Sequence, residues 1–72
     1  MKKYVFSDHA KRRLLERDIN EETVKFVIEK PDYTLNRFRD EIEAIKKMNG
    51  ETLKVVYVEK ENFIKVITLY WM

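Results

Sequence analysis

The chain has 72 residues, a formal net charge of +2 and no cysteine. This length predicts one domain spanning residues 1–72, and the lack of cysteine excludes a disulfide framework and thiolate zinc sites. A single histidine is too few for a typical zinc site, so we expect neither a metal nor a cofactor. No long apolar run is present, which predicts no signal peptide or membrane span and indicates a cytoplasmic protein. Charged residues make up 39% of the chain, mostly Lys and Glu, which favours a heat-adapted source.

The first part of the chain predicts a short strand followed by two helices. Residues 2–6 favour a leading strand, and Ser7 or Asp8 is a suitable N-cap for a helix that runs to about Arg17. Asn20 caps a second helix, which must end before the single proline. Because only a few residues separate the two helices, we expect a tight helical hairpin.

The second part of the chain has the pattern of strands. Residues 33–38 are a moderate strand candidate, and stronger candidates cover residues 41–48, 52–58 and 63–72. Asn49-Gly50 is the strongest short hairpin signal, because both central residues of a type I′ turn need positive φ. This turn fixes a register that pairs Met48 with Glu51, Lys46 with Leu53, Ala44 with Val55, and Ile42 with Tyr57.

Apolar side chains alternate onto both faces of the last predicted strand. Ile64, Val66, Thr68 and Tyr70 are expected on one face. Two helices can cover only one side of a sheet, so the other side would leave an exposed patch that is typical of an interface. We predict that a partner or a second copy binds there, over Val56, Phe63, Ile67, Leu69 and Trp71. The fold class is α+β, with the helical hairpin on one face of a three- to four-stranded antiparallel sheet.

The first helix is the basic part of the chain. Residues 1–17 contain six Lys or Arg and two Asp or Glu, which gives a net charge of +4. His9, Arg13 and Arg17 are spaced by four residues and therefore lie on one side of the helix. We call these three residues the basic ladder. Ala10 and Leu14 define the buried direction, so the basic ladder follows the border between core and solvent.

Two interpretations of the basic ladder stay open. In the structural one, the arginine stems cover the edge of the core and pair with acids from the second helix or the strands. In the functional one, the ladder borders an anionic site, with Arg forks on phosphate oxygens and a histidine that moves protons. Lys11 and Arg12 would add phosphate contacts. Arg12 also lies between Asp8 and Glu16, and we expect these three side chains largely to pair with one another. Glu16 is also three residues from Arg13 and could neutralise it instead, which leaves His9 and Arg17 without local partners.

The last strand adds a second group of candidates. Thr68 and Tyr70 lie on one face, and the predicted register places Tyr57 beside them. Such a face is most often ordinary strand packing. A functional version would use the Tyr70 hydroxyl as an acid or a phosphate contact, with Thr68 and Tyr57 binding phosphate.

The sequence resembles a small prokaryotic domain-of-unknown-function family, catalogued as four-two-five-eight. The resemblance rests on His9-Ala10, Arg13, Glu16-Arg17, Ile19, Pro31-Asp32 and the strand Val66-Ile67-Thr68-Leu69-Tyr70. That family is similar to the RelE/ParE toxin superfamily, whose fold is two helices on an antiparallel sheet. The resemblance implies a toxin-like role, a small antitoxin-like partner and catalytic groups on the late strands.

The residue patterns, together with what the family resemblance implies, leave two functions open. The first is a toxin-type, metal-independent endoribonuclease, with His9, Arg13, Arg17 and Tyr70 as catalytic residues. The alternative is a non-catalytic interaction module, a homodimer or a subunit of a complex, in which the basic ladder is structural.

Overall fold

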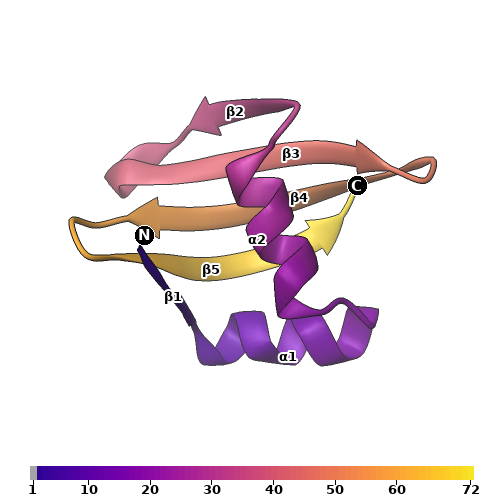
Figure 1. Cartoon of the computed structure of the whole chain (residues 1–72), viewed down its shortest axis with the longest axis horizontal. Coiled ribbons are helices and arrows are strands. Elements are labelled where there is room, and N and C mark those ends of the chain that lie inside the picture. The colour runs from indigo at the N-terminus through magenta and orange to yellow at the C-terminus, as the bar shows by residue number, and fades with distance from the viewer. Residues whose placement is uncertain (1) are drawn as a thin grey trace.

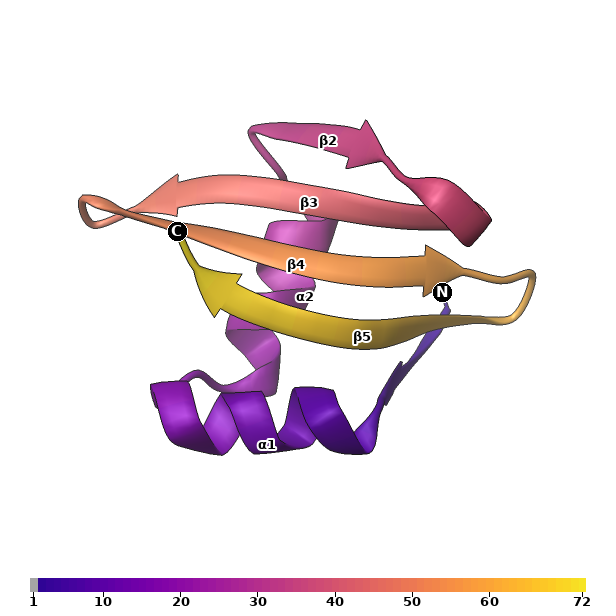
Figure 2. The same ribbon diagram turned by 180° about the vertical axis from the view of Figure 1, so that it is seen from behind.

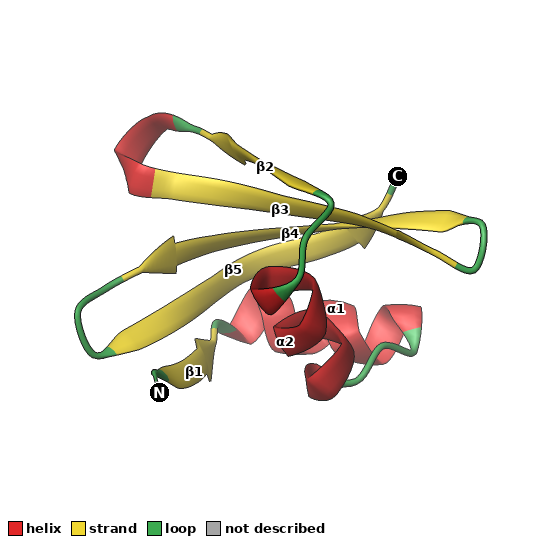
Figure 3. Ribbon diagram, turned by 45° about the horizontal axis from the view of Figure 1, so that its top comes forward, coloured by secondary structure: helices red, strands yellow, loops and turns green. Residues whose placement is uncertain are grey.

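The computed structural model describes residues 2–72 and contains five strands, two α-helices and one 3-10 turn. In chain order these are β1 (Lys3–Phe6), α1 (Asp8–Arg17), α2 (Glu21–Glu29), β2 (Tyr33–Asn36), the 3-10 turn η1 (Phe38–Asp40), β3 (Glu41–Met48), β4 (Glu51–Glu59) and β5 (Phe63–Trp71). The strands form one sheet with the order β1-β5-β4-β3-β2 (Figure 1). The sheet and the helices make two layers (Figure 3).

The sheet is mixed, which corrects the predicted three- to four-stranded antiparallel sheet. β2, β3, β4 and β5 pair antiparallel, whereas β1 joins the edge of β5 in parallel, with Lys3 opposite Phe63. The leading strand belongs to the sheet because its alternate residues reach the core. Phe6 is buried, and Tyr4 packs against the core cluster. The predicted α+β class is confirmed at this coarser level.

Both helices begin at the predicted caps. The Ser7 hydroxyl accepts a hydrogen bond from the Ala10 N–H at 3.0 Å, and Asn20 Oδ1 accepts one from the Thr23 N–H at 2.8 Å. α1 ends at Asp18, which adopts the left-handed conformation with φ 54°. α2 crosses one face of the sheet, while α1 lies beside the β5 edge and is visible from both sides (Figures 1 and 2). No helix within residues 2–72 has the length and apolar character to span a membrane.

The β3–β4 hairpin has the register that the Asn-Gly signal predicts. Asn49 and Gly50 have φ values of 52° and 84°, so both central residues of the turn occupy the left-handed region. All four predicted pairs, from Met48–Glu51 to Ile42–Tyr57, are present. The local turn chemistry therefore determines which side chains of β3 and β4 share a face.

A β-bulge reverses the predicted faces in the second half of β5. Val56 pairs with Thr68, but the next residue of β4, Tyr57, pairs with Val66, so Ile67 is the extra residue. Past the bulge, Leu69 is fully buried in the core cluster under the helices, and Trp71 packs against that cluster. The prediction that both lie on the opposite, partner-binding side is wrong. A pure two-residue alternation does not allow for an inserted residue.

The face of the sheet turned away from α2 is called here the open face (Figure 2). By the observed register it carries Glu43 on β3, Lys54 and Val56 on β4, and Thr68 and Tyr70 on β5. Ile45 and Val56 are buried without belonging to the core cluster of the helix side, and Phe63 and Ile67 are half-buried. The open face is therefore less apolar than the sequence predicts.

Candidate functional site

The basic ladder contains one direct contact. Arg13 Nε donates a hydrogen bond to His9 Nε2 over 3.4 Å, and Arg13 Nη1 lies 3.4 Å from Glu16 Oε1. His9 is exposed and Arg13 is half-buried, with 32% of its side chain accessible. The contact follows from the helix, because residues four apart stack on one side. In this contact the guanidinium is the donor and the imidazole nitrogen Nε2 is the acceptor.

The other basic residues of α1 are open to solvent. Lys11, Arg12 and Arg17 are exposed, and none of them forms an ion pair within residues 2–72. The expected pairing of Arg12 with Asp8 and Glu16 is wrong, because Glu16 turns to Arg13 instead. Three cations on one short helix are thus available to an external anion.

Tyr70 belongs to a separate cluster on the open face that the sequence patterns above do not predict. Arg37 Nη1 lies 3.0 Å from Glu43 Oε2, and Lys54 Nζ lies 3.2 Å from Glu43 Oε1. Lys54 Nζ also lies 5.6 Å from the centre of the Tyr70 ring. Arg37, Glu43, Lys54 and Tyr70 are called the open-face cluster. Thr68 is the next residue of β5 on the same face.

Glu43 is the centre of the open-face cluster. Its side chain is only 10% exposed, and each carboxylate oxygen contacts one cation. Burial lowers the pKa of Lys54, but the contacts with Glu43 and with Tyr70 outweigh this effect, so the pKa is raised above its ordinary value. Both cations are therefore engaged by the chain's own carboxylate. The signal that could have revealed the cluster is the hairpin register, which places Glu43 diagonal to Lys54 on one face.

Tyr57 does not lie beside Thr68 and Tyr70 as predicted. It faces the helices, is 6% exposed and belongs to the core cluster. Burial, followed by the charge of Glu59, raises the pKa of its phenol. A side chain in this position does not reach a phosphate from solvent. No hydrogen bond or ion pair between described residues joins the basic ladder to Thr68 or Tyr70.

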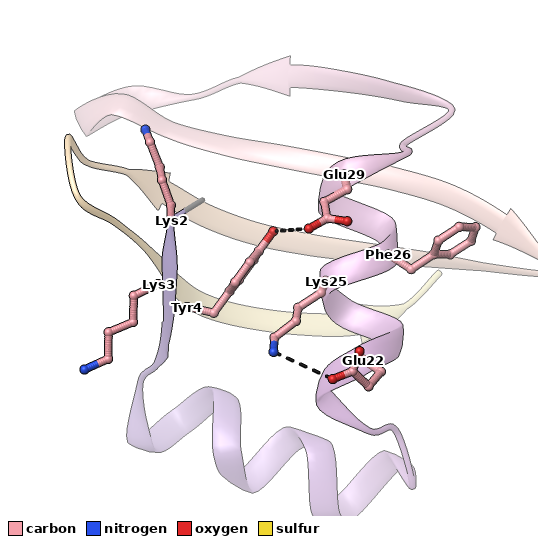
Figure 4. Close-up of a pocket in the computed structure, with 7 residues that line it drawn as sticks. All are labelled: Lys2, Lys3, Tyr4, Glu22, Lys25, Phe26 and Glu29. Carbon is pink, nitrogen blue, oxygen red and sulfur yellow. Dashed lines mark hydrogen bonds and ion pairs between the residues drawn. The ribbon is translucent and has the colours of Figure 1, made fainter.

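A hollow of about 620 Å³ lies between β1 and α2 and was also not predicted (Figure 4). Tyr4 reaches from β1 toward α2, where its hydroxyl donates a hydrogen bond to Glu29 Oε2 at 3.2 Å. Burial and the Glu29 carboxylate raise the pKa of Tyr4 to about 12. Lys25 Nζ lies 5.5 Å from the Tyr4 ring centre and 3.7 Å from Glu22 Oε1. The tyrosine keeps its proton, and Lys25 and Glu29 are each engaged by another side chain that lines the hollow.

Within residues 2–72 no three His, Cys, Asp or Glu side chains are grouped as metal ligands. A family model described as "Domain of unknown function (DUF4258)" matches residues 6–71. No curated protein and no solved structure matches the chain.

Proposed function

This chain belongs to the domain-of-unknown-function family DUF4258, and we propose that it is a toxin-like, metal-independent endoribonuclease whose site is the basic ladder of α1. The observation that supports the proposal most directly is the 3.4 Å contact between Arg13 Nε and His9 Nε2 on an exposed helix surface. A proton-transfer group and a phosphate-binding group are held next to each other there.

The proposed reaction uses the ladder as follows. A phosphodiester binds and draws the Arg13 guanidinium from Glu16 and His9, since a bidentate phosphate contact is stronger than a 3.4 Å bond to an imidazole. His9 Nε2 then accepts the proton of the ribose 2′-OH, whose oxygen attacks the adjacent phosphorus. The bond from phosphorus to the 5′-oxygen breaks, and the imidazolium returns the proton to that oxygen. The products are a 2′,3′-cyclic phosphate and a 5′-hydroxyl.

The remaining cations have binding roles in this proposal. Arg17 stabilises the extra negative charge on the phosphorane, and Lys11 and Arg12 hold the flanking phosphates. Tyr70 and Thr68 have a secondary role, because the cations of the open-face cluster are already paired with Glu43. Tyr57 has no role, because it lies in the core.

The direct test is cleavage of a mixed-sequence RNA by the purified chain in EDTA. The wild type is expected to produce fragments with 2′,3′-cyclic ends, and His9→Gln is expected to lower the rate by at least about 100-fold, the usual contribution of a general base. Glutamine keeps an acceptor for Arg13 but does not carry the proton. Arg13→Ala is expected to weaken RNA binding as well as cleavage.

A matched control removes one positive charge elsewhere. Lys30 is exposed at the end of α2, and Lys30→Ala should leave both binding and cleavage unchanged. Folding of every variant is checked by circular dichroism. Intact RNA in the presence of folded wild type, or equal cleavage by wild type and His9→Gln, contradicts the proposed chemistry.

Expression in bacteria tests the toxin-like role. Wild type should arrest growth and degrade RNA, whereas His9→Gln should not, and co-expression of a small antitoxin-like partner should restore growth. Normal growth with undamaged RNA for the wild type would instead favour the alternative function, a non-catalytic interaction module. One observation favours this alternative. Large apolar residues at the β2 edge are exposed to solvent, Leu35 to 48% and Phe38 to 92%.

A further inference from the structure

The two edges of the sheet differ in how they are protected. β1, at one edge, is preceded by Lys2 and starts with Lys3, and it continues directly into α1. Lysines at an edge are a common device against pairing with another chain. β2, at the other edge, has the sequence YTLN, without a charge, a glycine or a proline. All four of its residues are exposed. β2 is as short as β1, but it lacks the charged side chains that commonly protect an edge.

The register shows which backbone groups of β2 face outward. In an antiparallel pair, alternate residues direct both N–H and C=O toward the partner strand. The Arg37 N–H donates to the Glu41 carbonyl at 2.7 Å, so positions 33, 35 and 37 point toward β3. The N–H and C=O groups of Thr34 and Asn36 consequently point away from the sheet, toward whatever lies beyond its edge.

We propose that a second copy of this chain pairs with this edge, β2 against β2 and antiparallel, with the two-fold axis at Leu35. In this register Thr34 faces Asn36 of the other copy, and each of these pairs exchanges two backbone hydrogen bonds. The five-stranded sheet of each copy becomes half of one continuous sheet. The proposed surface differs from the apolar sheet face that the sequence predicts, and it does not depend on the ribonuclease proposal.

The side chains of β2 complement their own copy in this register. On the open face Leu35 meets Leu35 of the other copy as a non-hydrogen-bonded pair, which is the closer kind. Tyr33 meets Arg37 of the other copy, an aromatic ring beside a guanidinium that Glu43 already holds in place at 3.0 Å. On the helix side the polar Thr34 and Asn36 meet. No like charges oppose one another, and the pairing covers Tyr33 and Leu35, which are 52% and 48% exposed.

Single cysteine variants test the register, because the chain has no cysteine of its own. Leu35→Cys places two thiols directly opposite each other at a spacing that a disulfide accepts. Phe38→Cys is the matched control, since position 38 faces position 32 of the other copy in this register. Under mild oxidation Leu35→Cys is expected to form covalent dimers roughly tenfold faster or more. Random collision would favour Phe38→Cys instead, because Phe38 is the more exposed residue. Equal or faster cross-linking of Phe38→Cys overturns the proposal.

A backbone substitution tests the hydrogen bonds. Thr34→Pro removes an N–H that the monomer does not use, and prolines are tolerated at such edge positions. Thr34→Val keeps the N–H and is the control. Sedimentation equilibrium should show a wild-type dimer, an unchanged dimer for Thr34→Val and a loss of roughly tenfold or more in dimer affinity for Thr34→Pro. A wild type that sediments as a monomer at every concentration refutes the pairing.

Discussion

Replacement of Glu43 by glutamine tests the energetics of the open-face cluster. The carboxylate is 10% exposed and contacts Lys54 at 3.2 Å and Arg37 at 3.0 Å. Glutamine has nearly the same shape, but its NH₂ group faces a cation and cannot accept from it. Removal of one partner from a fully buried ion pair costs about 3–5 kcal/mol. Because Lys54 keeps 16% and Arg37 48% of its side-chain exposure, water compensates part of the loss. We expect a destabilisation of about 2–3 kcal/mol.

Thermal and urea denaturation followed by circular dichroism measure this effect. In a domain of this size the expected loss lowers Tm by roughly 10–20 °C. Glu51→Gln is the control, because Glu51 is exposed on the neighbouring strand and has no ion pair within residues 2–72. Its effect should stay within about 0.5 kcal/mol.

A double-mutant cycle then separates the two ion pairs. The coupling energy between Glu43 and Lys54 should exceed that between Glu43 and Arg37, since Arg37 is the more exposed partner. A loss of stability in Glu43→Gln no larger than that of Glu51→Gln, or a larger coupling energy with Arg37 than with Lys54, would contradict this role of Glu43.

Three further predictions concern stability. Ser7→Ala should cost about 1–2 kcal/mol in urea denaturation, because the hydroxyl accepts from Ala10 N–H and donates to the Ile67 carbonyl at 2.8 Å; an unchanged midpoint would contradict this. The pKa of Tyr4 is raised from 10.0 to about 12 in the folded chain, so its stabilising contribution is complete below pH 10 and is lost between pH 10 and 12. Tyr4→Phe should therefore flatten the alkaline decline of the unfolding free energy, and an identical pH profile would exclude the role of the phenol. Asp32 accepts from the Lys47 N–H at 2.8 Å, and this bond, with the charge of Lys46, lowers the pKa of its carboxyl despite some desolvation. The carboxylate therefore stabilises the fold above pH 3.8, and this stabilisation is lost as the pH falls through the lowered pKa of the folded state. Asp32→Asn should weaken the dependence of Tm on acid pH. A steeper dependence of Tm on acid pH in this variant would contradict the role of the Asp32 carboxylate.

Local chemistry predicts much of this fold. The caps at Ser7 and Asn20 and the turn at Asn49-Gly50 each depend on residues that are adjacent in sequence. The hairpin register follows from the turn alone, and with it the core positions of β3 and β4. The predictions of these features are confirmed because the residues that determine each feature lie close together in the sequence.

The sequence patterns do not predict the features that depend on contacts between distant parts of the chain. The insertion of Ile67 has no composition signal, and it reversed the predicted positions of Leu69 and Trp71. The parallel pairing of β1 with β5 joins opposite ends of the chain. The salt bridge between Arg37 and Glu43 requires the connection of β2 to fold back on β3. Of the candidate site, helical spacing predicted that His9, Arg13 and Arg17 share one side of α1, but it indicated neither the hydrogen bond from Arg13 to His9 nor that Arg12 would stay unpaired.

The parallel pairing of β1 with β5 has a consequence for biosynthesis. Within residues 2–72, β1 pairs only with β5, which is synthesised much later, so β1 and the α1 segment that is tied to β5 through Ser7 cannot complete their contacts until β5 has been made. The β3–β4 hairpin can form early, because its contacts are local, whereas closure of the sheet must await the synthesis of β5. A nascent chain stalled before β5 would display the β4 edge and the apolar residues of both helices, and it would be a substrate for chaperones or proteases.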